Sequence, residues 1–306
     1  MRVAVSTLSA PPARFIGSEL MTLRLARALQ DAGHDVTVHP RVDCDAEHIH
    51  AGIRITPEPI SDADIIVCHA DYGIRARRAK KLANVPIVAI CHNTGPGVKI
   101  GLVNTHPDLA VVNSAAMQDA LRITDALIVN PPAPQIVHMR PGRCITTLSL
   151  NELKGGAQFW QVTETLPRSP FLAVQGGYGK QLVEQRPNVR VLEHVAPDEL
   201  DRRVWRHTGI FLQLSESESW GMAAAEAIAH GIPVIAHPTP GVVENLGDAA
   251  VYVDRDDIVG IAEAIQAIQQ DPARHRQRAQ LRAAQHVATS QLQVAQWVAA
   301  IERLVA

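Results

Sequence analysis

The strongest constraint on the fold is a recurring alternation along the chain. Short runs rich in valine and isoleucine are separated by longer stretches whose apolar residues follow a helical period. Apolar runs without alternating polar positions are typical of strands buried on both faces, and the intervening helices would cover a parallel sheet from either side. The sequence therefore predicts an α/β protein with doubly wound, Rossmann-like sheets.

The predicted strands form two sets of similar size. The first set lies at residues 3–8, 35–39, 64–69, 86–91, 109–113 and 126–130. The second lies at residues 144–150, 171–175, 189–194, 209–214, 233–237 and 250–253. A chain of 306 residues is long enough for two domains with separate cores. We therefore expect two sheets in two domains.

A proline-rich segment, NPPAPQIVHMRPGR, separates the two sets of strands. A continuous helix is excluded there by Pro131, Pro132, Pro134, Pro141 and Gly142. We place the domain boundary in this segment, with one domain at residues 1–141 and the other at residues 142–306.

Helix signals are clearest near the two ends of the chain. Ser18 is expected to cap a first helix, which Gly33 ends in the left-handed conformation. Two last helices are expected at residues 257–270 and at about 291–305, the former with isoleucines on one face.

Charge excludes a general affinity for nucleic acid or anionic membranes, since 29 Lys and Arg oppose 31 Asp and Glu. One local exception is the run RARRAKK at residues 75–81. Such a run is typical of a solvated helix face. It also fits a partner molecule that bears phosphate, is linked to lipid, or is a nucleic acid.

The sequence favours a cytoplasmic protein, with peripheral attachment to a membrane left open. Its start does not read as a signal peptide, and no apolar window is long enough to span a bilayer. The four cysteines contain no CxxC pair, which favours reduced thiols. Neither a metal site nor a cofactor is predicted, because no set of His, Cys or Asp residues has ligand spacing.

The segment at residues 209–257 carries the most informative motif. Glu218 lies in a predicted loop after a strand, and Glu226 lies about one turn into the following helix, with a Trp-Gly pair between them. Each carboxylate can accept two hydroxyl hydrogen bonds, and the amides that open a helix attract phosphate. Such a pair can bind hydroxyl groups on either side of a phosphate.

This segment resembles the donor-binding signature of the large family four of retaining glycosyltransferases, also called glycosyl transferases group 1. The resemblance implies that Glu226 binds the ribose and that Glu218 binds the transferred sugar. It also implies donor contacts from the loop, the helix start and the following turn, namely Ser219, Trp220, Gly221, Met222 and Gly241.

Two further parts of the predicted C-terminal domain share the resemblance. Lys154 and Gly155 match a Lys-Gly pair whose ammonium neutralises charge on the leaving diphosphate. Gly176 belongs to a glycine-rich turn that the family places near the nucleotide base. One departure is that Ser149 stands near the position of a usual arginine, so diphosphate neutralisation would be weaker or come from another arginine.

The N-terminal half resembles the family around its first helix and at two strand ends. Gly17 matches the second glycine of a loop that approaches the donor phosphate, and His92 matches a histidine that contacts the transferred sugar. On the acceptor side we place His69, Asp71 and Tyr72.

The resemblance implies the GT-B fold, in which two facing Rossmann-like domains hold the donor and the last helix returns to the N-terminal domain. The implied reaction transfers a hexosyl or pentosyl group from a nucleotide diphosphate sugar to an acceptor hydroxyl, with retention and without a metal. Two alternatives remain open: a sugar-nucleotide epimerase of the same fold, and a noncatalytic nucleotide-sugar-binding protein. Donor base, donor sugar and acceptor stay open as well.

Overall fold

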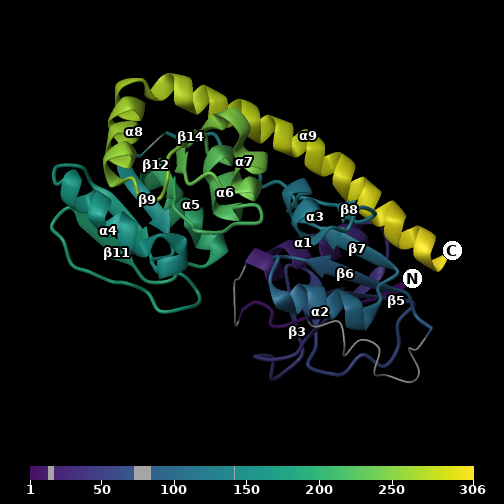
Figure 1. The fold of residues 1–306 in the computed structure, drawn as a ribbon. Coiled ribbons are helices and arrows are strands. Elements are labelled where there is room, and N and C mark those ends of the chain that lie inside the picture. Colours follow the sequence, from purple (N-terminus) through teal and green to yellow (C-terminus); the bar gives the residue numbers. More distant parts are fainter. Residues whose placement is uncertain (13–16, 72–83, 141) are drawn as a thin grey trace. The chain divides into compact units, whose positions relative to one another are not determined.

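The computed structural model describes residues 1–12, 17–71, 84–140 and 142–306. They form two compact units (Figure 1): unit 1 comprises residues 1–132 and 289–306, and unit 2 comprises residues 133–288. Residues 129–140, in the proline-rich segment, contain neither helix nor strand. Residue 141, where the sequence predicts the boundary, lies outside the described residues.

Unit 1 contains an eight-stranded sheet with the order β3-β4-β2-β1-β5-β6-β7-β8. Its strands are β1 (Arg2–Thr7), β2 (Asp35–Pro40), β3 (His48–His50), β4 (Ile53–Ile55), β5 (Ile65–His69), β6 (Ile87–Cys91), β7 (Leu109–Val112) and β8 (Leu127–Ile128). All neighbouring strands pair in parallel except β3 and β4. Every residue of β5 and β6 is buried, as expected for central parallel strands.

The described helices that precede the proline-rich segment are α1 (Gly17–Asp31), α2 (Pro96–Thr105) and α3 (Ala115–Leu121). Gly33 adopts φ 90° after α1, which confirms the predicted helix end. The predicted cap is wrong, because Ser18 lies inside α1 and its hydroxyl donates to the Glu19 carboxylate at 2.5 Å. Ser114 instead caps α3, accepting from the amide of Met117 at 3.1 Å.

Unit 2 contains a six-stranded, wholly parallel sheet with the order β11-β10-β9-β12-β13-β14. Its strands are β9 (Cys144–Leu148), β10 (Phe171–Val174), β11 (Val189–Leu192), β12 (Thr208–Gln213), β13 (Val234–Ala236) and β14 (Ala250–Tyr252). The chain moves outward from β9 to β11 and then returns to the other side of β9 with β12. The strand order therefore reverses between β9 and β12, as in a dinucleotide-type Rossmann sheet.

Helices cover both faces of the unit 2 sheet. One face packs against α4 (Gly156–Thr165) and α8 (Ile258–Gln270), and the other against α6 (Met222–Ala229) and α7 (Pro240–Leu246). Short helical elements are η3 (Glu152–Lys154), η4 (Pro197–Glu199), α5 (Leu200–Arg203), η5 (Trp205–His207) and η6 (Gly247–Ala249). The predicted doubly wound α/β architecture is thus confirmed in unit 2.

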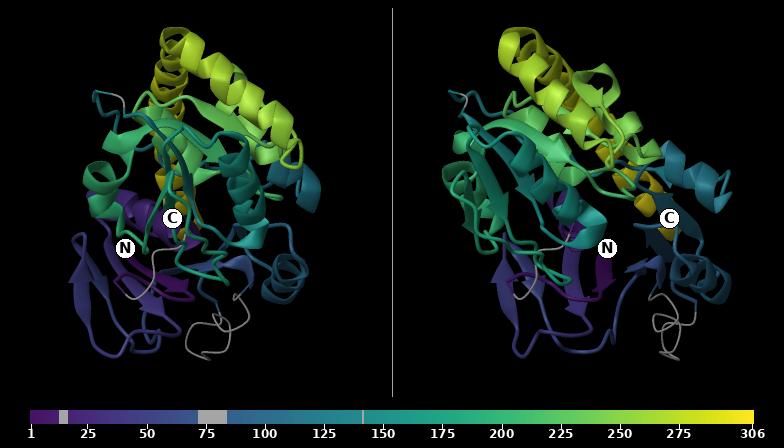
Figure 2. Two further views of the ribbon diagram at one scale, coloured as in Figure 1. Left: turned by 90° about the vertical axis from the view of Figure 1, so that its left-hand side faces the viewer. Right: turned by 60° about the vertical axis from the view of Figure 1, so that its left-hand side comes forward.

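The last helix, α9 (Pro272–Val305), belongs to both units. Figure 2 shows it as one uninterrupted helix. Residues up to 288 belong to unit 2, and those from 289 belong to unit 1. In unit 1, Trp297 is fully buried and its indole N–H donates to the carbonyl of Leu25 at 3.2 Å. The helix starts well before residue 291, the predicted start.

Two further features concern only the described parts of the chain. No helix there is both long and apolar enough to cross a bilayer. The four cysteines are free thiols, of which Cys68 and Cys91 are buried on β5 and β6.

Candidate functional site

The loops that follow β9 and β12 lie side by side because the strand order of unit 2 reverses between these strands. Open parallel sheets bind ligands at such a reversal, beyond the carboxyl ends of the strands. Lys154 ends the η3 turn after β9, and Glu218 lies in the loop after β12. The two residues singled out from sequence therefore meet at this edge.

Lys154 and Glu218 form an ion pair: the Lys154 ammonium donates to Oε1 of Glu218. Two more donors reach the same oxygen, Ser215 Oγ at 2.9 Å and Gln213 Nε2 at 3.1 Å. The side chains of Lys154 and Glu218 are only 23% and 16% exposed, so water screens the pair weakly. Glu218 is thus a fixed carboxylate with its Oε1 oxygen saturated by donors.

The surroundings of Lys154 keep its ammonium charged. Burial alone would lower the pKa of Lys154, but the carboxylate of Glu218 and the phenol of Tyr178 more than offset it, so the pKa lies above its ordinary value. At neutral pH the site therefore carries a positive charge held close to a carboxylate.

Arg255 fixes the turn that presents Lys154. Its side chain is buried and donates through Nη2 to the carbonyl of Glu152 at 2.9 Å and to Gln158 Oε1 at 3.1 Å. Asn151 caps the same turn, since its Oδ1 accepts from the amide of Lys154 at 2.9 Å. Because both ends of the turn are held, the Lys154 backbone has little freedom.

Gly155 allows the Lys154 turn to pack directly on the end of β12. Its φ is +85°, and a Cβ there would lie 2.5 Å from Cβ and 2.6 Å from the carbonyl oxygen of Leu214. Only glycine fits both the conformation and the close approach. The Lys-Gly pair noted in the sequence therefore combines a charged side chain with the backbone contact that places it.

Gly176 lies in the neighbouring turn, where Gln181 holds two backbone segments together. Gln181 Oε1 accepts from the amides of Gly176 and Leu150, both at 2.8 Å. A Cβ on Gly176 would lie 2.4 Å from the hydroxyl oxygen of Ser149, so the close packing explains this glycine. Its predicted proximity to a nucleotide base stays a prediction.

Ser149, which stands near the family's arginine position, adopts an unusual backbone. Its φ is +81°, in the left-handed region that non-glycine residues rarely occupy. Its amide donates to the carbonyl of Val174 at 2.8 Å. Strain of this kind is held by surrounding contacts and occurs preferentially at functional sites.

The loop after Glu218 leads into α6 through a left-handed glycine. Gly221 has φ +82° and is the N-cap of α6, which begins at Met222 and makes no side-chain cap hydrogen bond. The amides at this helix start suit an anion. Trp220 is buried and its carbonyl accepts from Asn245 Nδ2 at 2.7 Å. Glu226 lies one turn into α6 and is half-buried.

Gly241, at the start of α7, packs against the backbone of the Glu218 loop. A Cβ on Gly241 would lie 2.2 Å from the carbonyl oxygen of Ser219 and 2.7 Å from that of Glu218. This close approach holds the loop in place. It also explains why a glycine is needed at position 241.

The candidates of unit 1 gather at strand ends. His69 ends β5 and His92 follows β6, with ring centroids 4.4 Å apart in an edge-to-face arrangement. Asp71 accepts from Asn93 Nδ2 at 3.2 Å. Gly17 is the first residue of α1 and is exposed. Tyr72 and the run at residues 75–81 lie outside the described residues.

Burial acts strongly on the two histidines. It lowers the pKa of His69 to about 4, and burial together with neighbouring His69 lowers the pKa of His92 well below its ordinary value. Both rings are therefore neutral at neutral pH. Only 4% of the surface of His69 is exposed, and its acceptor role stays a prediction.

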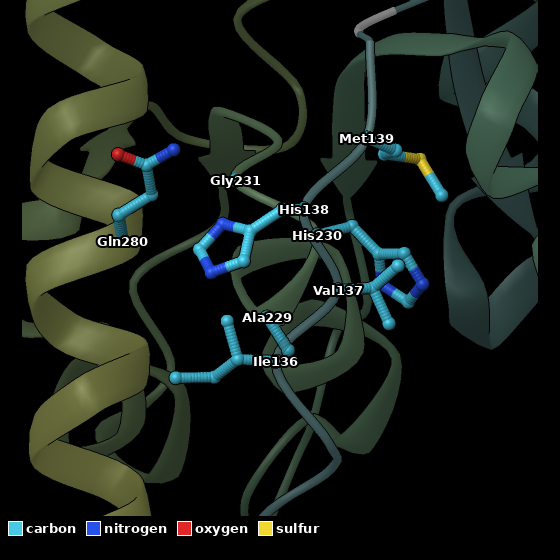
Figure 3. Close-up of a pocket in the computed structure, with 8 residues that line it drawn as sticks. All are labelled: Ile136, Val137, His138, Met139, Ala229, His230, Gly231 and Gln280. Carbon is cyan, nitrogen blue, oxygen red and sulfur yellow. The ribbon is translucent and has the colours of Figure 1, made fainter.

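A hollow of about 350 Å³ lies elsewhere in unit 2 (Figure 3). None of the candidate residues lines it; its walls come from Ile136, Val137, His138, Met139, Ala229, His230, Gly231 and Gln280. His230 bonds acceptors through both ring nitrogens, the Glu226 carbonyl at 2.7 Å and the Asp201 carboxylate at 2.8 Å. Nor does any group of three His, Cys, Asp or Glu side chains in the described residues form a metal site.

Three contributors to these clusters are missed by sequence reasoning. Arg255 lies in a charged stretch, VDRDD, that is typical of an exposed loop. Gln181 follows the glycine-rich turn without any motif. Thr22, whose hydroxyl lies 2.9 Å from Nε2 of His69, stands among the apolar residues of α1. Thr22 and Arg255 are buried polar side chains, and Gln181 joins two backbone segments, but neither burial nor such contacts are visible in a single sequence.

Comparison with known proteins connects this geometry to a family. Residues 180–286 match the family model described as glycosyl transferases group 1. These residues include β12, the Glu218 loop and α6. Comparison with curated protein sequences finds no match.

Several solved structures share the fold over nearly the whole chain. Sucrose-phosphate synthase from Thermosynechococcus elongatus is 16% identical with a TM-score of 0.80, covering 99% of each chain. Anabaena HepE in complex with UDP-glucose is also 16% identical with a TM-score of 0.80, covering 98% of this chain and 100% of that one. An α-glucosyltransferase in complex with UDP and DNA is 15% identical with a TM-score of 0.67, covering 96% and 99%.

The family model and the fold agree with each other, since the matched residues contain the loop and helix that were singled out from sequence. The chain thus has the GT-B fold of two Rossmann-like units, and its residues 180–286 are similar to the glycosyl transferases group 1 family.

Proposed function

We propose that this protein transfers a sugar from a nucleotide diphosphate sugar to an acceptor hydroxyl, with retention of anomeric configuration. The observation that carries the proposal is the Lys154–Glu218 pair at the strand-order reversal of unit 2. A fixed cation suits the diphosphate, and a fixed carboxylate suits hydroxyls of the sugar. The match of residues 180–286 to the glycosyl transferases group 1 model supports the same reaction class.

In this proposal Lys154 stabilises the charge that develops on the leaving diphosphate. Its raised pKa keeps the ammonium protonated at neutral pH, and its turn is held by Arg255 and Asn151. The amides at the start of α6 add a second source of positive potential. Transfer is then expected without a divalent ion, so a chelator such as EDTA should leave the rate unchanged.

Glu218 is proposed to orient the transferred sugar rather than to attack it. Its Oε1 is bonded to Lys154, Gln213 and Ser215, which fixes the plane of the carboxylate. Glu226, about one turn into α6, is proposed to bind the ribose hydroxyls. His92 is proposed to contact the transferred sugar, a role that rests on the resemblance noted from sequence.

A panel of nucleotide sugars tests the proposal, and UDP-glucose comes first because HepE and an α-glucosyltransferase were solved with UDP-glucose or UDP. Each donor is incubated with sugars, sugar phosphates or DNA, and free nucleotide is measured. A transferase releases nucleotide in step with product, and proton NMR of the product gives the anomeric configuration. An altered donor without release indicates an epimerase, and donor-dependent stabilisation alone indicates a binding protein.

A further inference from the structure

The hydroxyl of Thr22 in α1 faces three hydrogen-bonding groups. It lies 2.9 Å from the carbonyl oxygen of Ser18, 2.9 Å from Nε2 of His69 and 3.2 Å from Nε2 of His92. Thr22 is only 1% exposed, so bulk water does not compete for these contacts. One hydroxyl thus joins α1 to the ends of two neighbouring strands, β5 and β6.

Only one placement of protons satisfies all three contacts. A hydroxyl has one hydrogen to donate and two lone pairs to accept with. The Ser18 carbonyl can only accept, so the hydrogen of Thr22 points to it, as is common for threonine four residues along a helix. Both imidazoles must then donate to Thr22, and each carries its hydrogen on Nε2.

The packing of the two rings holds this arrangement in place. The rings meet edge to face with centroids 4.4 Å apart, and His69 is buried. Because burial lowers the pKa of each histidine, both rings are neutral near pH 7, and a neutral ring with hydrogen on Nε2 presents a lone pair at Nδ1. His92 is thereby defined as an acceptor on its Nδ1 side.

We propose that Thr22 is a positioning residue that fixes His69 and His92 in the Nε2–H tautomer and so sets how His92 faces the sugar. This inference rests on the proposed function only for the role of His92. The tautomers themselves follow from the contacts of Thr22. A sugar hydroxyl that meets the Nδ1 side of His92 must therefore donate its hydrogen to that nitrogen.

The test compares three variants. Thr22→Val keeps the shape of the side chain but removes the hydroxyl, and Thr22→Ser keeps the hydroxyl. Thr105→Val is the matched control, because Thr105 is a buried threonine of unit 1 whose hydroxyl has no hydrogen-bond partner among the described residues. The readouts are nitrogen-15 NMR of the histidine rings, the thermal midpoint, and kcat and KM for UDP release from UDP-glucose.

The wild type and Thr22→Ser should show hydrogen on Nε2 of both rings, and Thr22→Val should lose this pattern. Loss of an oriented hydrogen bond predicts that kcat falls about tenfold to a hundredfold in Thr22→Val, with Thr22→Ser and Thr105→Val near wild type. A merely structural role would move the thermal midpoint but not the tautomers.

Hydrogen on Nδ1 of either ring in the wild type would overturn the inference, whatever the activity. A Thr22→Val variant with altered tautomers and unchanged kcat would refute the positioning role. If wild-type protein releases no UDP from UDP-glucose, the NMR result decides alone, so failure of this inference is distinguishable from failure of the proposed function. Wild-type spectra also decide if Thr22→Val does not fold.

Discussion

Lys154 and Glu218 are 64 residues apart in sequence, yet their side chains form a partly buried ion pair. Each follows one of the two strands between which the unit 2 sheet reverses its order. The pair brings opposite charges to the edge where parallel sheets bind ligands. Water screens both charges only weakly, because each side chain is less than a quarter exposed.

Replacing Glu218 should reduce transfer strongly without unfolding the protein. We expect Glu218→Ala to lower kcat by about a hundredfold to a thousandfold, the usual effect of removing one oriented electrostatic contact. The matched control is Glu216→Ala in the same loop, whose carboxylate is 65% exposed and lies 3.7 Å from Arg255. Nucleotide release and the thermal midpoint are measured for both; equal activity of Glu218→Ala and wild type would remove Glu218 from the site.

Arg255 should matter for the geometry of the Lys154 turn. Arg255→Lys keeps the charge but cannot hold the Glu152 carbonyl and the Gln158 amide at once, so we expect about tenfold lower kcat and a loss of about 2 kcal/mol in unfolding free energy. Arg202→Lys is the control, because Arg202 is 68% exposed and its ion pair within the described residues is with Glu199. Urea titration and nucleotide release measure the two effects. Identical behaviour of the two variants would contradict the positioning of Lys154 by Arg255.

Substituting two glycines with similar backbone angles distinguishes the cost of backbone strain from the cost of a steric clash. Gly33 has φ +90° with nothing within 4 Å of an added Cβ, whereas Gly155 has φ +85° and a Cβ there would strike Leu214. We expect Gly33→Ala to cost about 1 kcal/mol and Gly155→Ala about 2 to 3 kcal/mol more. Denaturant unfolding of both variants gives the difference. Equal losses would mean that the Lys154 turn can move away from β12.

Acid should destabilise the protein through its buried histidines. The pKa of His69 is lowered from 6.5 to about 4, so between these values the unfolded chain binds a proton that the folded chain does not. The unfolding free energy must therefore fall as pH falls from 6.5 to 4, by about 3 kcal/mol from His69 alone.

The variant His69→Gln should flatten this pH dependence, and His207→Gln, which changes an exposed histidine, should leave it as in wild type. Urea unfolding at several pH values between 7 and 4 measures both slopes. A slope that is the same in His69→Gln and wild type would show that His69 takes up its proton in the folded protein.

The twelve predicted strands are all present, whereas β3 and β4, which the described part of unit 1 also contains, are not predicted. Buried parallel strands are uniformly apolar, so composition alone marks them. The missed strands β3 and β4 are three residues long and lie at the sheet edge with polar positions among them. Ala51 and Gly52 join them with φ 49° and 79°; two positive values are typical of a tight hairpin turn, yet alanine is a rare residue for it.

The candidate site was predictable as residue types but not as contacts. Glu218 and Lys154 could be named because each lies beside a local motif, whereas their pairing depends on strand order. Thr22 and Arg255 could not be named, because their importance comes from burial next to distant groups. A single sequence reveals local motifs, but it does not reveal which distant residues come into contact.

The discontinuous make-up of unit 1 has a consequence for how the chain matures. Residues 1–132 leave the ribosome before unit 2, but Trp297 and Ile301, both with no exposed surface, are synthesised only after all of unit 2. The interior of the unit 1 sheet is therefore closed only when residues 289–306 of α9 have been made, whereas unit 2 is a single uninterrupted stretch. A nascent chain arrested before residue 289 should expose the unfinished interior of unit 1 to proteases and chaperones.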